Sequence, residues 1–180
     1  GMAAWPSSIH RPSFNIPLIF SGPGIIKGVS ETFVSQLDLA NTLLDLADAE
    51  KLKGHRVDSK TLDLSDLNSQ NRKMLFMEQE ESRAIRNEQW LYIERFNKDS
   101  LSYLGSELYD LKEDPDERNN LSNSVSHKNT ISSLSKELSQ YYDKFSDPKF
   151  NLWAGGSAKS NVSNLSFWKK AWGSKWKTTI

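Results

Sequence analysis

The sequence contains no cysteine, which excludes disulfides, thiolate metal sites and cysteine nucleophiles. It also has no excess of charge, because 23 Lys and Arg residues balance 23 Asp and Glu residues. Without a basic excess, nucleic acid is not an expected partner. No apolar run reaches the ~18 residues of a transmembrane segment. The opening residues, GMAAWPSS, lack the basic and apolar regions of a signal peptide.

Motifs for catalysis or metal binding are equally scarce. The three histidines, His10, His55 and His127, are far apart and lie near no nucleophile elbow or metal-ligand spacing. Glu78 and Glu80 share a strand face, but a pair of this kind is more typical of a solvated surface than of a glycosidase site. The residues therefore predict no catalytic residue and no metal ligand within this chain.

Two elements are predicted in the first third of the chain. Residues 15–21 (NIPLIFS) form a short, nearly continuous apolar run that is typical of a strand buried on both faces. Such a strand needs covering helices, which this chain hardly supplies. Residues 35–50 repeat apolar side chains at helical spacing, with Ser35 and Asp38 placed as a capping-box variant.

An antiparallel meander is predicted next. Strands are expected at residues 73–79, at residues 106–111, and twice within residues 82–96 with a turn at 87–89. A helix over residues 126–145 follows, and its apolar stripe is expected to cover one face of the sheet.

The segment ELYDLKEDPDERNNLS, residues 107–122, concentrates carboxylates around a proline. An EF-hand interpretation fails, because Lys112 and Pro115 occupy positions that require an oxygen ligand and a glycine. Asp114, Pro115 and Asp116 instead suit three successive positions of a β-turn.

The tail, residues 151–180, contains four of the six tryptophans, five lysines and no acidic residue. Trp168, Trp172 and Trp176 are four residues apart and would form one stripe on a helix. Three interpretations stay open: insertion at a membrane interface, stacking on sugars, and packing on the protein's own surface.

Four segments in order resemble the C-terminal third of the type I sulfatases. They are IPLIFSGPGI (residues 16–25), SQLDLANTLLDLAD (35–48), RAIRNEQWLYI (83–93) and ELYDLKEDPDERNNL (107–121). One departure is GHRV from Gly54, where relatives show a G-x-S-L pattern. The segments FMEQEESRAIR and DPKFNLWAGG are similar to bacterial members of the family.

The resemblance implies an α+β architecture. A small four-stranded antiparallel sheet is packed by a C-terminal helix, and is preceded by a strand and a helix that belong to a larger α/β domain related to alkaline phosphatase. The resemblance divides the chain into residues 1–60 (the end of the large domain), 61–150 (the sheet and helix subdomain) and 151–180 (the tail). The missing N-terminal sulfatase domain becomes the expected partner. With its apolar faces uncovered, the isolated chain is expected to form a homo-oligomer.

The resemblance also implies where the catalytic groups are. The family uses a formylglycine, made from a C/S-x-P-x-R motif, together with calcium, and neither that motif nor the calcium ligands occur in this chain. From their proximity to the apolar run at residues 15–21, and not from a motif match, His10 and Arg11 are expected to line the edge of a sulfate pocket. The parent enzyme would be periplasmic or secreted.

Two hypotheses follow. In the first, the chain is a C-terminal fragment of a sulfatase that acts on a sulfated glycan or an aryl sulfate, and the fragment is inactive alone. In the second, it is a stand-alone carbohydrate- or surface-binding module that uses Trp168, Trp172 and Trp176.

Overall fold

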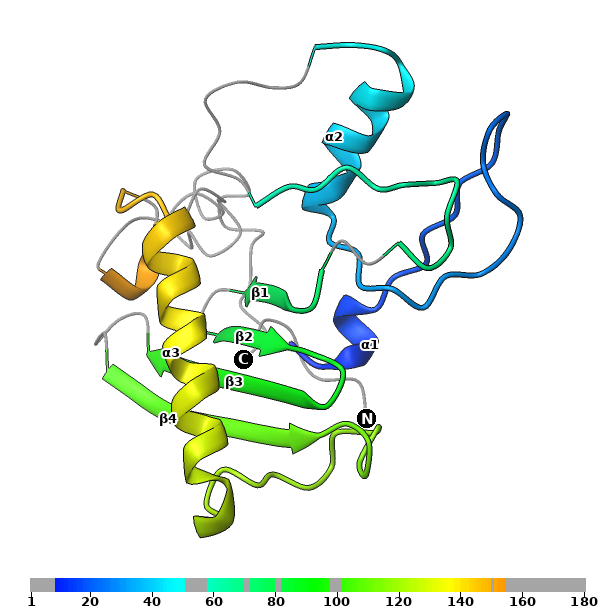
Figure 1. Ribbon diagram of the computed structural model, residues 1–180. Helices are drawn as coiled ribbons and strands as arrows, with labels where there is room; N and C mark the ends of the chain where they lie inside the picture. The colour runs from blue at the N-terminus through cyan, green and yellow to red at the C-terminus, as the bar shows by residue number, and fades with distance from the viewer. Residues whose placement is uncertain are drawn as a thin grey trace, which may run out of the picture.

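A four-stranded antiparallel sheet, with strand order β1-β2-β3-β4, forms the centre of the computed structural model (Figure 1). The structure describes residues 9–50, 58–69, 72–79, 82–97, 102–149 and 151–154. The strands are β1 (Leu75–Gln79), β2 (Ser82–Arg86), β3 (Trp90–Asn97) and β4 (Ser102–Asp110). The predicted meander is confirmed.

The hairpin between β2 and β3 is set by Asn87. Its side-chain Oδ1 accepts hydrogen bonds from the backbone N–H groups of Gln89 (2.9 Å) and Trp90 (2.7 Å), the Asx-turn geometry that makes asparagine a turn residue. This turn fixes the register in which Arg86 pairs with Leu91. Alternate side chains of β3 therefore face opposite sides of the sheet.

One face of the sheet is covered by α3 (Lys128–Phe145), which follows a short 3-10 helix, η1 (Val125–His127). Leu134, Leu138 and Tyr142 recur every four residues and are buried against the sheet. Their partners on the strands are Ile85, Tyr92 and Leu108. The helix predicted for this face is confirmed.

The other face is covered by residues from the start of the chain. Ile9, which is only 1% exposed, packs with Ala84, Leu91, Ile93 and Tyr109. The short helix α1 (Arg11–Phe14) follows Ile9 directly, and its Phe14 is packed against the same cluster. The sheet is thus buried on both faces, and the second cover comes from a segment about 70 residues away in sequence.

The predicted helix in residues 35–50 is confirmed as α2 (Leu37–Leu46), but the predicted strand at residues 15–21 is not a strand. Residues 15–21 are irregular, and Ile16, Leu18 and Ile19 are exposed. A strand requires the edge of another strand for its backbone hydrogen bonds, and none of the described residues provides one here. The apolar pattern is therefore present without the pairing that it normally accompanies.

Candidate functional site

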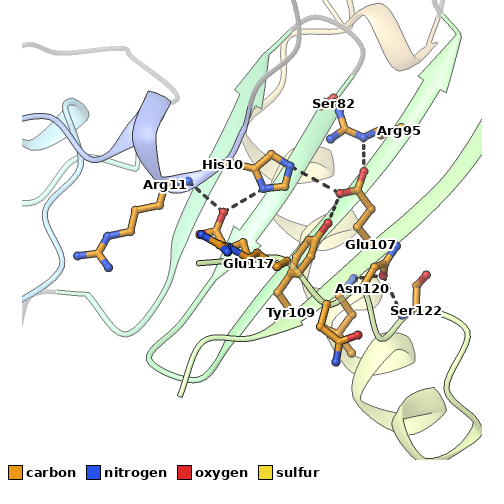
Figure 2. Close-up of polar contacts among 12 residues, drawn as sticks. His10, Arg11, Ser82, Arg95, Glu107, Tyr109, Glu117, Asn120 and Ser122 are labelled. Carbon is orange, nitrogen blue, oxygen red and sulfur yellow. Dashed lines mark hydrogen bonds and ion pairs between the residues drawn. The ribbon is translucent and has the colours of Figure 1, made fainter. Parts of the chain in front are cut away.

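The predicted site residues His10 and Arg11 lie on the sheet face opposite α3, and one carboxylate holds both of them (Figure 2). The His10 Nδ1 atom is 2.9 Å from Glu117 Oε2, and the Arg11 backbone N–H donates to the same oxygen over 3.1 Å. His10 precedes α1, so Glu117 fixes the point at which that helix begins.

Glu117 reaches this position because of the turn in the acidic segment. Its backbone N–H donates to the carbonyl of Asp114 over 3.1 Å, which closes the turn predicted at Asp114, Pro115 and Asp116. The backbone of Glu117 is left-handed, with φ of 57°, a conformation that costs energy for a residue with a side chain. Its Oε1 accepts from Arg86 Nη1 at 3.1 Å.

A second carboxylate, that of Glu107 on β4, lies on the other side of the imidazole. Its Oε1 is 2.5 Å from Arg95 Nε, and its Oε2 accepts from the Tyr109 hydroxyl over 2.7 Å. The His10 Nε2 atom lies 3.7 Å from the same Oε2. His10 is thus placed between two carboxylates, and its ring meets Tyr109 edge to face with centroids 5.6 Å apart.

Both carboxylates are held in the ionised form. Burial would raise the pKa of Glu117, but the hydrogen bonds from His10 and the Arg11 backbone, with the charge of Arg86, lower it below its ordinary value. Burial would likewise raise the pKa of Glu107, but the hydrogen bonds from Arg95 and Tyr109 outweigh it, and this pKa is also lowered. The neighbouring carboxylate and burial raise the pKa of Tyr109.

This cluster therefore acts as an anchor. A carboxylate whose pKa is lowered and whose oxygens are already paired is a poor general acid, and a buried base needs a free lone pair directed at substrate. Arg11 is different, because its guanidinium points away from the carboxylates (Figure 2) and lines an open groove. His10 holds the segment in place, whereas Arg11 presents a cation that can contact an anion.

A groove runs between the irregular segment of residues 15–37, the connection at residues 58–69, and the β1 side of the sheet. Arg11 and Arg86 are its basic lining residues, and Arg86 is already paired with Glu117. Its other lining residues are aliphatic, aromatic and uncharged polar side chains, together with several carboxylates.

A buried ionic cluster that the sequence did not reveal joins α2 to the connection that leads to β1. Asp38 is fully buried and accepts from Arg72 Nε at 2.8 Å and from Arg72 Nη2 at 2.5 Å. Arg72 Nη1 also donates to Asp58 Oδ2 over 2.5 Å, and Nη2 to the Asp58 carbonyl. Burial opposes ionisation of Asp38, but Arg72 and the backbone N–H groups of Ser35 and Lys60 lower its pKa. The Ser35 N–H bond, at 2.8 Å, is the carboxylate half of the predicted capping box.

A third cluster holds the residues that follow α3. The Arg83 guanidinium lies over the Tyr142 ring, 3.9 Å from its centroid, and 4.9 Å from that of Trp153. Arg83 also donates to Asn151 Oδ1 over 2.8 Å and to Glu78 Oε1 over 2.8 Å. Glu78 is accordingly an ion-pair partner, as expected for a surface carboxylate.

The structure does not describe some of the predicted features. Trp168, Trp172 and Trp176, and the GHRV segment from Gly54, lie outside the described residues. Within the part of the chain that is described, no group of three or more His, Cys, Asp or Glu residues is placed to hold a metal ion. The described helices include none with the length and apolarity needed to cross a bilayer.

Comparison with known proteins identifies the relatives. Residues 7–144 match the family described as N-sulphoglucosamine sulphohydrolase, C-terminal. A putative sulfatase from Bacteroides thetaiotaomicron is 28% identical, with a TM-score of 0.57 over 72% of this chain and 30% of its own. The 2-O GAG sulfatase BT1596 is 27% identical, with a TM-score of 0.56 over the same shares of 72% and 30%. The putative sulfatase yidJ from Bacteroides fragilis, at 21% identity and a TM-score of 0.50, is matched over 66% of this chain and 27% of its own, and shares the fold.

None of the curated proteins matches the chain. The chain spans about 30% of the length of the first two solved relatives.

Proposed function

Because the chain belongs to the family of the N-sulphoglucosamine sulphohydrolase C-terminal domain, we propose that it forms the C-terminal part of a sulfatase. The family match over residues 7–144 carries this proposal. A sulfated glycan is the proposed substrate class, since one of the solved relatives is a 2-O GAG sulfatase. The parent enzyme is proposed to be periplasmic or secreted.

We assign residues 1–60 to the end of a large upstream domain, residues 61–150 to the C-terminal subdomain, and residues 151–180 to the tail. Exposed apolar side chains support the first assignment. Ile16 and Ile19 on the irregular segment, and Leu43 and Leu46 on α2, are all more than half exposed. An upstream sheet would supply both a strand partner for residues 15–21 and an apolar surface for α2.

The catalytic groups are proposed to lie upstream. The chain contains no cysteine and no Ser-x-Pro-x-Arg sequence from which a formylglycine nucleophile could be made. The described residues also do not fit a calcium site, because no three of their His, Asp or Glu side chains are placed around a common point, and the carboxylates of Asp38 and Glu107 are paired with arginines. Alone, the chain is expected to be inactive.

Within the joined enzyme, Arg11 is the residue proposed to contact substrate. Its guanidinium lines the groove and makes no ion pair with any residue that the structure describes. A planar guanidinium suits a sulfate or carboxylate group, which it can bind through two parallel hydrogen bonds. His10 is proposed to position Arg11, because both are held by Glu117.

A stand-alone binding module is the second candidate, and the observation that favours it is the composition of the tail. Residues 151–180 combine four tryptophans with five lysines and no acid, a pattern that suits a sulfated polysaccharide or an anionic surface. When the upstream domain is absent, self-association of the isolated chain is one alternative cover for residues 15–21.

The test is to express the chain together with the sequence that precedes it in the genome. We expect an in-frame C/S-x-P-x-R motif, turnover of an aryl sulfate by the joined enzyme, and none by the 180-residue chain. In the joined enzyme, Arg11→Ala should raise KM for a sulfated oligosaccharide more than it lowers kcat, whereas Arg118→Ala, on the exposed turn, should change neither. Turnover by the chain alone, or the absence of the motif, would overturn the proposal.

A further inference from the structure

The groove has an apolar floor that nothing in the described structure covers. Several aliphatic side chains line it and are exposed at the same time: Ile16, Leu18, Ile19, Ile26, Val29 and Leu37. All of them come from residues 16–37. Exposed apolar surface of this extent marks a binding surface.

The same groove carries an excess of negative charge. Glu31, Asp63, Asp66 and Asp147 line it, and none of these carboxylates makes an ion pair with a residue that the structure describes. Among the described lining residues, Arg11 is the guanidinium without an ion pair to another described residue, since Arg86 is bound by Glu117. An occupant that is both apolar and basic is therefore favoured.

The tail of this chain has that composition. Trp168, Trp172 and Trp176 are four residues apart and would form one stripe on a helix, and residues 155–180 contain five lysines and no acidic residue. Burial of large aromatic rings on an aliphatic floor is the strongest apolar contribution that a short segment can make.

The described chain also ends beside the groove. Asp147 and Asn151 line it, and Arg83 clamps Asn151 and the following Trp153 to the sheet. Residues 155–167, rich in Gly and Ser, separate Ala154 from Trp168. A connection of that composition and length spans about 20 Å as a random coil, so the tail can return to the groove of its own chain.

We propose that residues 155–180 dock into the groove of their own chain, with the three tryptophans on the apolar floor and the lysines facing the carboxylates. A tail from a second copy could make the same contacts. The tethered tail has an effective concentration on the order of millimolar, which exceeds the concentration of second copies in a micromolar solution. The proposal applies to the 180-residue chain by itself and does not depend on its proposed activity.

Paramagnetic labelling tests this directly, because the chain has no native cysteine. A spin label at Val29→Cys, in the groove, should broaden the indole N–H signals of Trp168, Trp172 and Trp176 in the full-length chain. The matched control is a label at Val125→Cys, since Val125 is similarly exposed (75% against 81%) but does not line the groove. It should leave those signals unchanged.

Charge is tested with a double variant. Glu31→Lys with Asp66→Lys should weaken the broadening, whereas Glu113→Lys with Asp116→Lys, on the turn outside the groove, should not. Raising the salt to about 1 M, where the Debye length is about 3 Å, should also weaken it.

Two outcomes would overturn the proposal. One is equal broadening from the two labels, or none from either. The other is broadening in a mixture of spin-labelled chain and separate isotope-labelled chain, which would assign the groove to a second copy.

Discussion

The imidazole Nδ1 of His10 lies 2.9 Å from the Glu117 carboxylate, although the two residues are 107 positions apart. The contact joins the segment that covers one face of the sheet to the turn that follows β4. Since Arg86 on β2 binds the other oxygen of Glu117, a single buried carboxylate links the covering segment, the sheet and the turn. The stability of the sheet should therefore depend on Glu117.

Glu117→Gln should lower the free energy of unfolding by about 2 kcal/mol. The amide keeps the shape of the side chain but removes the charge that His10 and Arg86 face. Urea unfolding followed by circular dichroism measures the change. Glu113→Gln, on the exposed part of the same turn, is the control and should leave the unfolding midpoint unchanged; equal midpoints for all three proteins would show that the cluster does not contribute.

Acid should destabilise the fold through the same carboxylates. The pKa values of Glu107 and Glu117 are lowered in the folded protein from an ordinary 4.5, so their contribution is complete above that value. It is lost as the pH falls below 4.5 and through the lowered folded pKa values.

Unfolding by urea at a series of pH values measures this loss. The loss should be smaller in Glu117→Gln, because one of the titrating groups is absent. An identical pH dependence in the variant and the wild type would mean that other groups control acid unfolding.

The regular elements were predictable because their signals are local. The alternation along β3 assigned Tyr92 to one face and Leu91 and Ile93 to the other, and the structure confirms both assignments. The four-residue spacing of Leu134 and Leu138 identified α3 in the same way. Both patterns arise from geometry within one element.

The anchor formed by His10 and Glu117 was not predictable, because its contacts are not local in sequence. Ile9 and His10 belong to no periodic segment, and Glu117 was assigned no role in the acidic segment beside the turn. Their contacts join residues far apart in sequence. Arg72 and Asp38 likewise carry no local sign that they form a buried pair. At residues 15–21 the local pattern predicted a strand, but a strand also depends on a partner that the sequence pattern does not specify.

Removal of one member of the Asp38 and Arg72 pair should be costly. Arg72→Met should destabilise the chain by about 3 to 5 kcal/mol, because it leaves the buried charge of Asp38 without its partner. Asp38→Asn should cost less, because Arg72 keeps its ion pair with Asp58. The double variant should lose less than the sum of the two single variants, since neither charge then remains. Equilibrium urea unfolding of the four proteins gives the coupling free energy.

A matched pair outside the core provides the control for that cycle. Arg118 and Asp116 also form an ion pair, at 3.1 Å, but their side chains are 80% and 68% exposed. Arg118→Met should leave the unfolding midpoint unchanged, because solvent screens an exposed pair. A coupling free energy near zero for Asp38 and Arg72 would contradict the buried-pair interpretation.

The Trp153 ring should determine whether the segment after α3 stays attached to the sheet. It packs against Phe96 with centroids 4.3 Å apart and the ring planes tilted by 40°, and it lies near the Arg83 guanidinium. Trp153→Ala removes both contacts, and should cost about 1 to 2 kcal/mol and accelerate limited proteolysis after Phe145. Trp153→Phe is the matched control, because it keeps an aromatic ring and loses only an indole Nε1 that has no hydrogen-bond partner among the described residues. If the alanine and phenylalanine variants were cleaved at the same rate as each other, the ring contacts would not be what holds this segment.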